Sequence, residues 1–175
     1  MTRYVVDAAH STVGFTVRHA GIGRTRGHFG VFEGEIDLPN ENSIEGASTH
    51  GTIEAASVDT NNSDRDNHLR SADFFEVEQF PTWTFESTKV EGTLEEFTLF
   101  GNLTIHGVTQ PVELAATFEG AATDPFGVQR IAFVATTTIS RKSFGLTWNA
   151  ALEAGGVLVS DKIAINLEIE AVKQD

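Results

Sequence analysis

The six histidines are the first residues whose chemistry must be considered, because an imidazole nitrogen binds metal ions and moves protons near neutral pH. They are His10, His19, His28, His50, His68 and His106. No two of them show the H-x-H or H-x-x-x-H spacing of a ligand pair. We therefore interpret them as hydrogen-bonding and surface residues and predict no metal site. A metal site assembled from separate strands is the alternative that this spacing leaves open.

A group of acidic and basic side chains occurs in the stretch DRDNHLRSADFF, which contains Asp66, His68, Arg70 and Asp73. These are residue types that general acid–base catalysis uses. The same side chains would also cap a short helix and tie it to the rest of the fold. We favour this structural interpretation. An enzyme that uses the group is the alternative.

The glycine-rich stretch 21–27, GIGRTRG, has glycines like those of a phosphate-binding loop but in a different arrangement. Its spacing is G-x-G-x-x-x-G, and a strand pattern follows it where a dinucleotide site needs a helix. We predict that it connects two strands. Arg24 and Arg26 as receptors of an anionic group are the alternative.

Two common classes of nucleophile are missing from the chain. It has no cysteine, which excludes thiolate nucleophiles, disulfides, iron–sulfur clusters and Cys-type zinc sites. It also has no G-x-S-x-G motif. We therefore predict no catalytic residue and no cofactor.

The charge balance restricts the partners. The chain has 12 Lys and Arg against 25 Asp and Glu, a formal net charge of −13. A nucleic-acid backbone would be repelled, so we predict no nucleic-acid partner. The same charge opposes steady docking on an anionic membrane, so a lipid carrier would need transient contact. With neither a secretory signal nor a membrane-length apolar stretch in this sequence, we expect a cytoplasmic protein without stable membrane insertion.

The elements that must position these residues are mostly strands. At 175 residues the chain is long enough for one substantial core, and we predict a single domain over 1–175. Apolar residues alternate with polar ones in most segments, as in half-buried strands. The predicted inward faces include Val13, Phe15 and Val17; Phe32, Ile36 and Leu38; Val112, Leu114, Ala116 and Phe118; and Ile163, Ile165, Leu167 and Ile169. About eight antiparallel strands of this kind indicate a barrel or a sandwich.

One stretch, Ser63 to Ala72, is typical of a short helix. Ser63 is its expected N-cap, with Asp64 and Asp66 in the first turn and Arg70 near the end, as the helix dipole favours. Such a short helix must dock on something, and Leu69 is its large apolar residue.

The 13 phenylalanines leave two interpretations of the interior. In a filled barrel they form the core. In a hollow barrel they form the wall of an apolar ligand site. Composition by itself favours the core.

Specific strings then resemble the YceI-like family. VVDAAHSTVGFTVRHAGIGRTRGHFGVFEGEI is similar to its opening, D-x-x-H-S-x-V-x-F-x-V-x-H followed by G-x-F-x-x-F-x-G. DNHLRSADFFEVEQFPTWTFEST looks like its most recognisable block. GNLTIHGVTQPVEL and SFGLTWNAALEAGGVLVSDKIAINLEIEAVK are similar to later blocks. The resemblance covers essentially the whole chain.

The resemblance implies an all-β fold, an eight-stranded antiparallel extended lipocalin-like barrel with one short helix. It also implies binding, transport or storage of a polyisoprenoid or similar long-chain amphiphilic lipid in an apolar interior, no established enzymatic activity, and a homodimer by analogy. The expected lining is Phe15, Val17, Phe32, Phe74, Phe85, Phe133 and Trp148, with His68 and Arg70 near a polar head group. Two other functions stay open: an enzyme acting on a lipid-like substrate through His68, Arg70 and Asp73, and a ligand-free structural or stress-response module.

Overall fold

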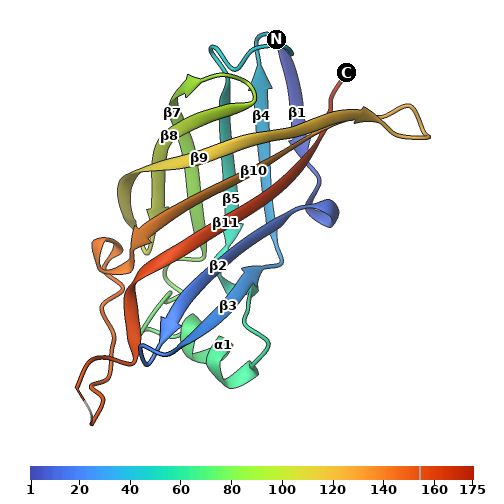
Figure 1. Ribbon diagram of the computed structural model, residues 1–175. Helices are drawn as coiled ribbons and strands as arrows, with labels where there is room; N and C mark the ends of the chain where they lie inside the picture. The colour runs from blue at the N-terminus through green and yellow to red at the C-terminus, as the bar shows by residue number, and fades with distance from the viewer. Residues whose placement is uncertain (154) are drawn as a thin grey trace.

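The alternating segments form eleven strands of one antiparallel sheet, which closes on itself as a barrel (Figure 1). The computed structural model describes residues 1–153 and 155–175. The strands are β1 (Thr2–Val6), β2 (Thr12–His19), β3 (Gly23–Phe29), β4 (Phe32–Leu38), β5 (Ser48–Glu54), β6 (Val58–Asp59), β7 (Thr82–Gly92), β8 (Glu96–Ile105), β9 (Val108–Thr123), β10 (Gln129–Ser140) and β11 (Val159–Lys173). Eight of them, β1, β4, β5, β7, β8, β9, β10 and β11, follow one another around the ring, and β11 pairs with β1. The predicted eight-stranded barrel is confirmed.

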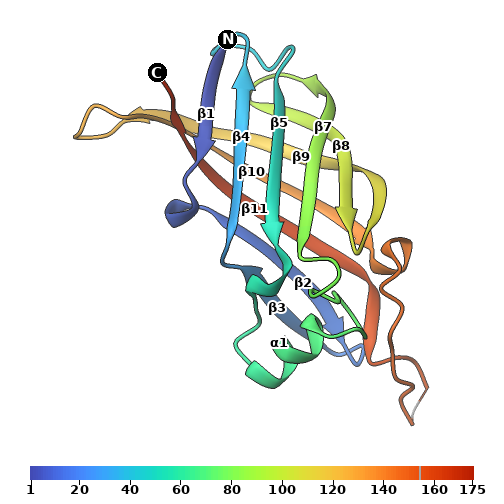
Figure 2. The same ribbon diagram turned by 180° about the vertical axis from the view of Figure 1, so that it is seen from behind.

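Strands β2 and β3 extend this ring at one end. The strand β11 pairs with β1 through Ala171 to Lys173 and with β2 through Val159 to Glu168. Strands β1 and β2 are therefore two parts of one bent strand, joined by the 3-10 helix η1 (Ala8–His10). Strands β3 and β4 follow each other in the same manner, and residues 30–31 join them without a helix. Figures 1 and 2 show β2 and β3 continuing the barrel toward the helix α1, away from the two chain termini.

The inward faces follow the predicted alternation. On β11 the side chains of Ile163, Ile165, Leu167 and Ile169 face the interior, as does Leu114 on β9. The pairing keeps these faces together, because Ile165 lies opposite Phe15 on β2 and Leu167 lies opposite Ala135 on β10. Since side chains alternate along a regular stretch of strand, one aligned pair places the face over Ile163 to Ile169, on the regular side of the register shift between Val159 and Ile163.

The helix α1 (Ser63–Arg70) ends two residues before the predicted Ala72, and its N-cap is Asn62. The expectation of Ser63 as N-cap is wrong: Asn62 has the extended backbone of a cap, and its side chain accepts a hydrogen bond from the Arg65 amide. Asp66 docks the helix, because its buried carboxylate accepts hydrogen bonds from the amide and hydroxyl of Thr60. Among the described residues, no helix is long and apolar enough to cross a bilayer.

Buried apolar side chains form two larger clusters. One contains Phe29, Phe75 and Trp83 and is joined by Leu69 of α1. The other contains Tyr4 and Phe133. Two further 3-10 helices, η2 (Ala55–Ser57) and η3 (Arg141–Phe144), join strands at the α1 end. The clusters leave a hollow between them, which is the candidate site.

Candidate ligand-binding site

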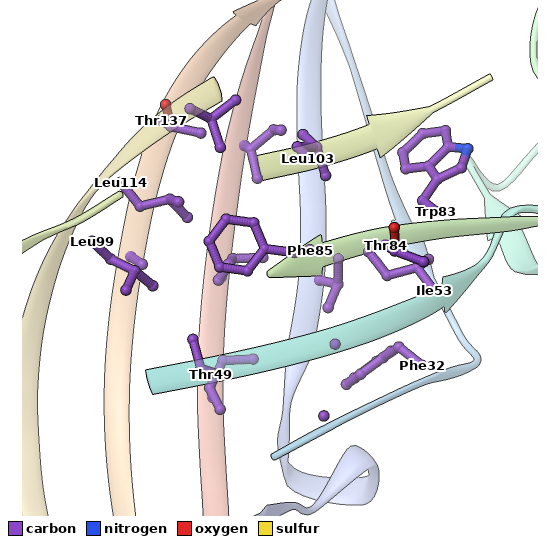
Figure 3. A pocket seen from close by; sticks show the side chains of 18 of the residues that line it. Phe32, Thr49, Ile53, Trp83, Thr84, Phe85, Leu99, Leu103, Leu114 and Thr137 are labelled. Carbon is purple, nitrogen blue, oxygen red and sulfur yellow. The ribbon is translucent and has the colours of Figure 1, made fainter. Parts of the chain in front are cut away.

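A cavity of about 300 Å³ lies inside the barrel, and its wall is almost entirely apolar. Most strands contribute to it, and α1 and the segment that follows it contribute Leu69, Phe74 and Phe75. Figure 3 shows part of the wall, with Phe85, Leu99 and Leu114 around the lumen. This volume lies at the lower end of the range of small-molecule sites, about 300–1,000 Å³. The interior is therefore hollow, as the resemblance implies, although composition favoured a filled core.

Six of the nine predicted site residues are in this wall: Phe15, Val17, Phe32, Phe74, Phe85 and Phe133. Five of them lie on strands, where the side-chain alternation turns them inward. The exception is Phe74, which lies after α1 and is positioned by a turn in which its amide donates to Ser71 O at 3.0 Å.

Glycines make room for two of these rings. Phe85 leans over Gly101 of the neighbouring strand, so that a Cβ at Gly101 would lie 2.3 Å from the ring. Phe15 leans over its strand partner Gly27 in the same way. Each ring therefore lies along the wall where a larger neighbour would push it into the lumen.

The other three predicted residues lie apart from the cavity wall. Trp148 packs against the rings of His68 and Phe74, with centroids 4.7 and 5.2 Å away. The Arg70 guanidinium donates to Ala56 O at 2.8 Å and to Val58 O at 3.1 Å. As ligand-binding residues, all nine remain predictions.

The acid–base group is only partly brought together. His68 Nε2 lies 2.9 Å from Asp73 Oδ2, and these side chains are 40% and 52% exposed. Arg70 is held by backbone carbonyls, and Asp66 is bonded to Thr60. Asp66 and Arg70 thus tie the helix to the residues before it, and His68 and Asp73 contact each other, which favours the structural interpretation of the group.

A buried cation in the wall was not found by sequence reasoning. Arg141 is only 3% exposed, at the α1 end of the cavity. Its guanidinium donates to Leu146 O at 2.7 Å, Ser160 O and Trp148 O at 2.9 Å, and Val159 O at 3.1 Å. Burial lowers the pKa of Arg141 from its usual value. The residue therefore joins the stretch from Leu146 to Trp148 to the start of β11 at Val159 and Ser160. No local sequence pattern indicates carbonyl acceptors so far along the chain.

Trp83 is another wall residue that is not among the predicted site residues. Its indole packs on Phe29 and Phe75, with centroids 4.7 and 4.9 Å away. Within the described residues its Nε1 is buried without a hydrogen-bond partner. Trp83 lines the cavity, whereas the half-buried Trp148 packs on His68 and Phe74, so the two indoles report on different places in a fluorescence measurement.

Outside the cavity, Asp7, His10 and Glu170 come together with all candidate ligand atoms within 4.8 Å. This is a grouping across separate elements, of the kind that histidine spacing left open. Arg130 already places a cation there, with Nη1 donating to Asp7 at 2.7 Å and to Glu170 at 3.2 Å. The hydrogen bonds from Arg130 and then from His10 lower the pKa of Asp7.

Comparison with known proteins extends these observations. A family model described as YceI-like domain matches residues 4–171. A UPF0312 protein of Vibrio cholerae is 36% identical over 177 residues, covering 98% of this chain and 87% of its own. The crystal structure of the Campylobacter jejuni YceI protein is 33% identical, with a TM-score of 0.78 and 90% of each chain covered. A polyisoprenoid-binding domain from Saccharophagus degradans has a TM-score of 0.74 over 98% of each chain at 15% identity, which shows a shared fold.

Proposed function

The chain belongs to the YceI-like domain family, and on this basis we propose that its barrel binds a polyisoprenoid or a similar long-chain amphiphilic lipid. The observation that carries the proposal is the apolar cavity of about 300 Å³ inside the barrel. The Saccharophagus degradans domain of the same fold, described as polyisoprenoid-binding, supports the class of ligand.

Burial of hydrocarbon supplies the affinity. The wall offers aromatic and branched aliphatic surfaces, which match the methyl-branched chain of an isoprenoid. Each buried CH₂ group contributes about 0.8 kcal/mol, so each added five-carbon unit strengthens binding until the cavity is full. Binding, with storage or transport as its use, fits this wall better than catalysis, because its polar side chains are few.

A chain-length series tests the proposal. In a Trp148→Phe variant, Trp83 is the remaining indole and it lines the cavity. We expect geraniol, farnesol and geranylgeraniol to change its fluorescence with affinities that rise with chain length and then level off. Native mass spectrometry should show one lipid per chain. Absence of binding by all three alcohols in both measurements would contradict the proposal.

The homodimer and the cytoplasmic location remain predictions. Light scattering of the purified protein tests the first. Fractionation of the source cells tests the second.

A further inference from the structure

One face of the molecule is basic although the chain as a whole is strongly acidic. Arg18 on β2, Arg24 and Arg26 on β3, and Lys162 on β11 are all exposed. We call these four residues the basic face. Arg18 lies opposite Arg24, and Arg26 lies opposite Thr16. Lys162 precedes Ile163, the partner of Val17, and lies in the irregular stretch between Val159 and Ile163, which runs alongside Arg18. The basic face therefore holds a third of the 12 Lys and Arg residues of the chain, and its three strands are adjacent in the sheet.

The four cations of the basic face form no ion pair within the part of the chain that the structure describes. Arg18 has one long hydrogen bond, from Nη1 to Gly21 O at 3.5 Å. The nearby carboxylate of Asp161 accepts hydrogen bonds from the Ser140 hydroxyl and the Lys142 amide, and it attracts Lys162 electrostatically, which leaves the three arginines without a close carboxylate contact among the described residues. The basic face is therefore free to meet an anionic partner.

An apolar tip projects beside the basic face. Ile22, in the turn between β2 and β3, is 90% exposed. The turn is held to the neighbouring loop by a hydrogen bond from the Ala20 amide to Leu158 O at 2.8 Å. That loop exposes half of Val157. Cations flanking exposed apolar side chains fit the interface of an anionic bilayer, where phosphates and hydrocarbon meet.

The tip and the basic face also lie at one end of the cavity. Val17 and Val159 line the cavity, and Val159 pairs with His19 immediately before the turn. Figures 1 and 2 show the β2–β3 turn at the α1 end of the molecule and the β9–β10 turn projecting at the other end. Phe126 in that second turn is 89% exposed. It is therefore a control for Ile22, since it is an exposed apolar side chain at the end of the molecule away from α1.

We propose that the basic face and Ile22 dock the protein on anionic phospholipid bilayers, with the α1 end of the cavity against the membrane. Lipid exchange at this end rests on the proposed function; the docking itself does not. The net charge of −13 does not prevent it, because at physiological ionic strength charges more than about 8 Å from the membrane are largely screened. Docking is then short-range and reversible, as a carrier needs.

Vesicle flotation with the full chain tests the proposal. We expect binding to vesicles of equal parts phosphatidylcholine and phosphatidylglycerol, and little binding to phosphatidylcholine alone. Each interfacial cation contributes about fivefold in affinity. The triple variant Arg18→Gln, Arg24→Gln, Arg26→Gln should therefore bind on the order of 100-fold more weakly. The control triple Arg3→Gln, Lys89→Gln, Lys173→Gln has the same net charge and should keep most of the binding.

Two serine variants test the contribution of the apolar tip to docking. Ile22→Ser should weaken flotation, and Phe126→Ser should not. Equal losses in the two triples, equal losses in the two serine variants, or no preference for phosphatidylglycerol would overturn the proposal. So would tighter binding of a fluorescent oligonucleotide to the basic face than of the vesicles. Farnesol binding without vesicles, measured by native mass spectrometry, distinguishes this failure from failure of the cavity as a lipid site.

Discussion

At the scale of single residues, the capacity of the cavity depends on small side chains as much as on aromatic ones. Ala116 and Ala135 face the lumen, and Gly34 and Gly51 lie opposite each other in its wall. Any of these positions would narrow the cavity if it held a larger residue. The sequence pattern places such residues on the inner face, but it does not reveal that they leave a hollow, because the lumen is bounded by side chains from distant strands.

Filling the cavity should abolish lipid binding without unfolding the barrel. Ala116→Phe places a ring in the lumen, whereas Ala115→Phe places the same ring on the outer face of the same strand. We expect Ala116→Phe to lower the affinity for farnesol at least tenfold and Ala115→Phe to leave it unchanged. Isothermal titration measures both, and circular dichroism checks that both fold. Equal affinities in the two variants would place the lipid elsewhere.

The glycine beside Phe85 should be intolerant of even a methyl group. Gly101→Ala puts a Cβ where the Phe85 ring lies and 2.7 Å from Glu86 O, and overpacking of this kind costs about 1–3 kcal/mol. Gly23→Ala is the control, because a Cβ there approaches His19 O only to 3.9 Å. Thermal unfolding should show a lower midpoint for the first variant only. The double variant Gly101→Ala, Phe85→Leu should recover part of the loss; no recovery would mean that the ring is not the cause.

At the scale of elements, the sequence pattern predicted those features of the fold that depend on residues close together in the chain. The alternation of Ile163 to Ile169 identified an inner face, and the charge pattern of Ser63 to Ala72 identified a helix. The predicted N-cap was wrong because two adjacent residues, Asn62 and Ser63, both have side chains that can cap a helix, and Asn62 is the one that does so. The sequence pattern could not find Arg141, whose four acceptors lie between Leu146 and Ser160 and depend on how that segment folds back.

Arg141 should control the opening of segment 146–160. Arg141→Met removes donors from four carbonyls, and each buried polar group left without a partner costs about 1–3 kcal/mol. We expect faster amide hydrogen exchange in this segment and a loss of stability of at least about 2 kcal/mol. Arg141→Lys keeps a cation but not the several donors of a guanidinium, so its stability should lie between those of the wild type and Arg141→Met. Exchange in the β9–β10 turn serves as the internal reference and should stay constant.

At the scale of the whole molecule, Arg130 links elements beside the closure of the barrel. It binds Asp7 after β1, Glu170 on β11 and Asp124 in the β9–β10 turn. The pKa of Asp7 is lowered chiefly by the hydrogen bond from Arg130, and the pKa of Asp124 chiefly by the backbone amide of Val128. A carboxylate whose pKa is lower in the folded than in the unfolded state stabilises the fold at pH values above its unfolded-state pKa, about 3.9 for an aspartate. This stabilisation is lost as the pH falls through the folded-state pKa.

Acid should therefore lower the free energy of unfolding more in the wild type than in a variant without the Arg130 cation. We expect the free energy of unfolding to fall below about pH 4, and to fall less steeply in Arg130→Gln, where the pKa of Asp7 returns toward its ordinary value. Lys89→Gln, which breaks an exposed pair with Glu91, is the control and should follow the wild type. Denaturant unfolding across the acid range measures the slopes; parallel curves for wild type and Arg130→Gln would contradict the linkage.

The short pairing of β1 with β11 has a consequence for synthesis of the protein. It joins Tyr4 to Lys173, Val5 to Val172 and Val6 to Ala171, residues that lie far apart in the sequence. A ribosome synthesises β1 long before β11, so the ring of strands cannot close until β11 has been made. Until then, β1 has an open edge able to pair with other chains. Factors that shield nascent strands should thus affect the yield of this protein more than its final stability.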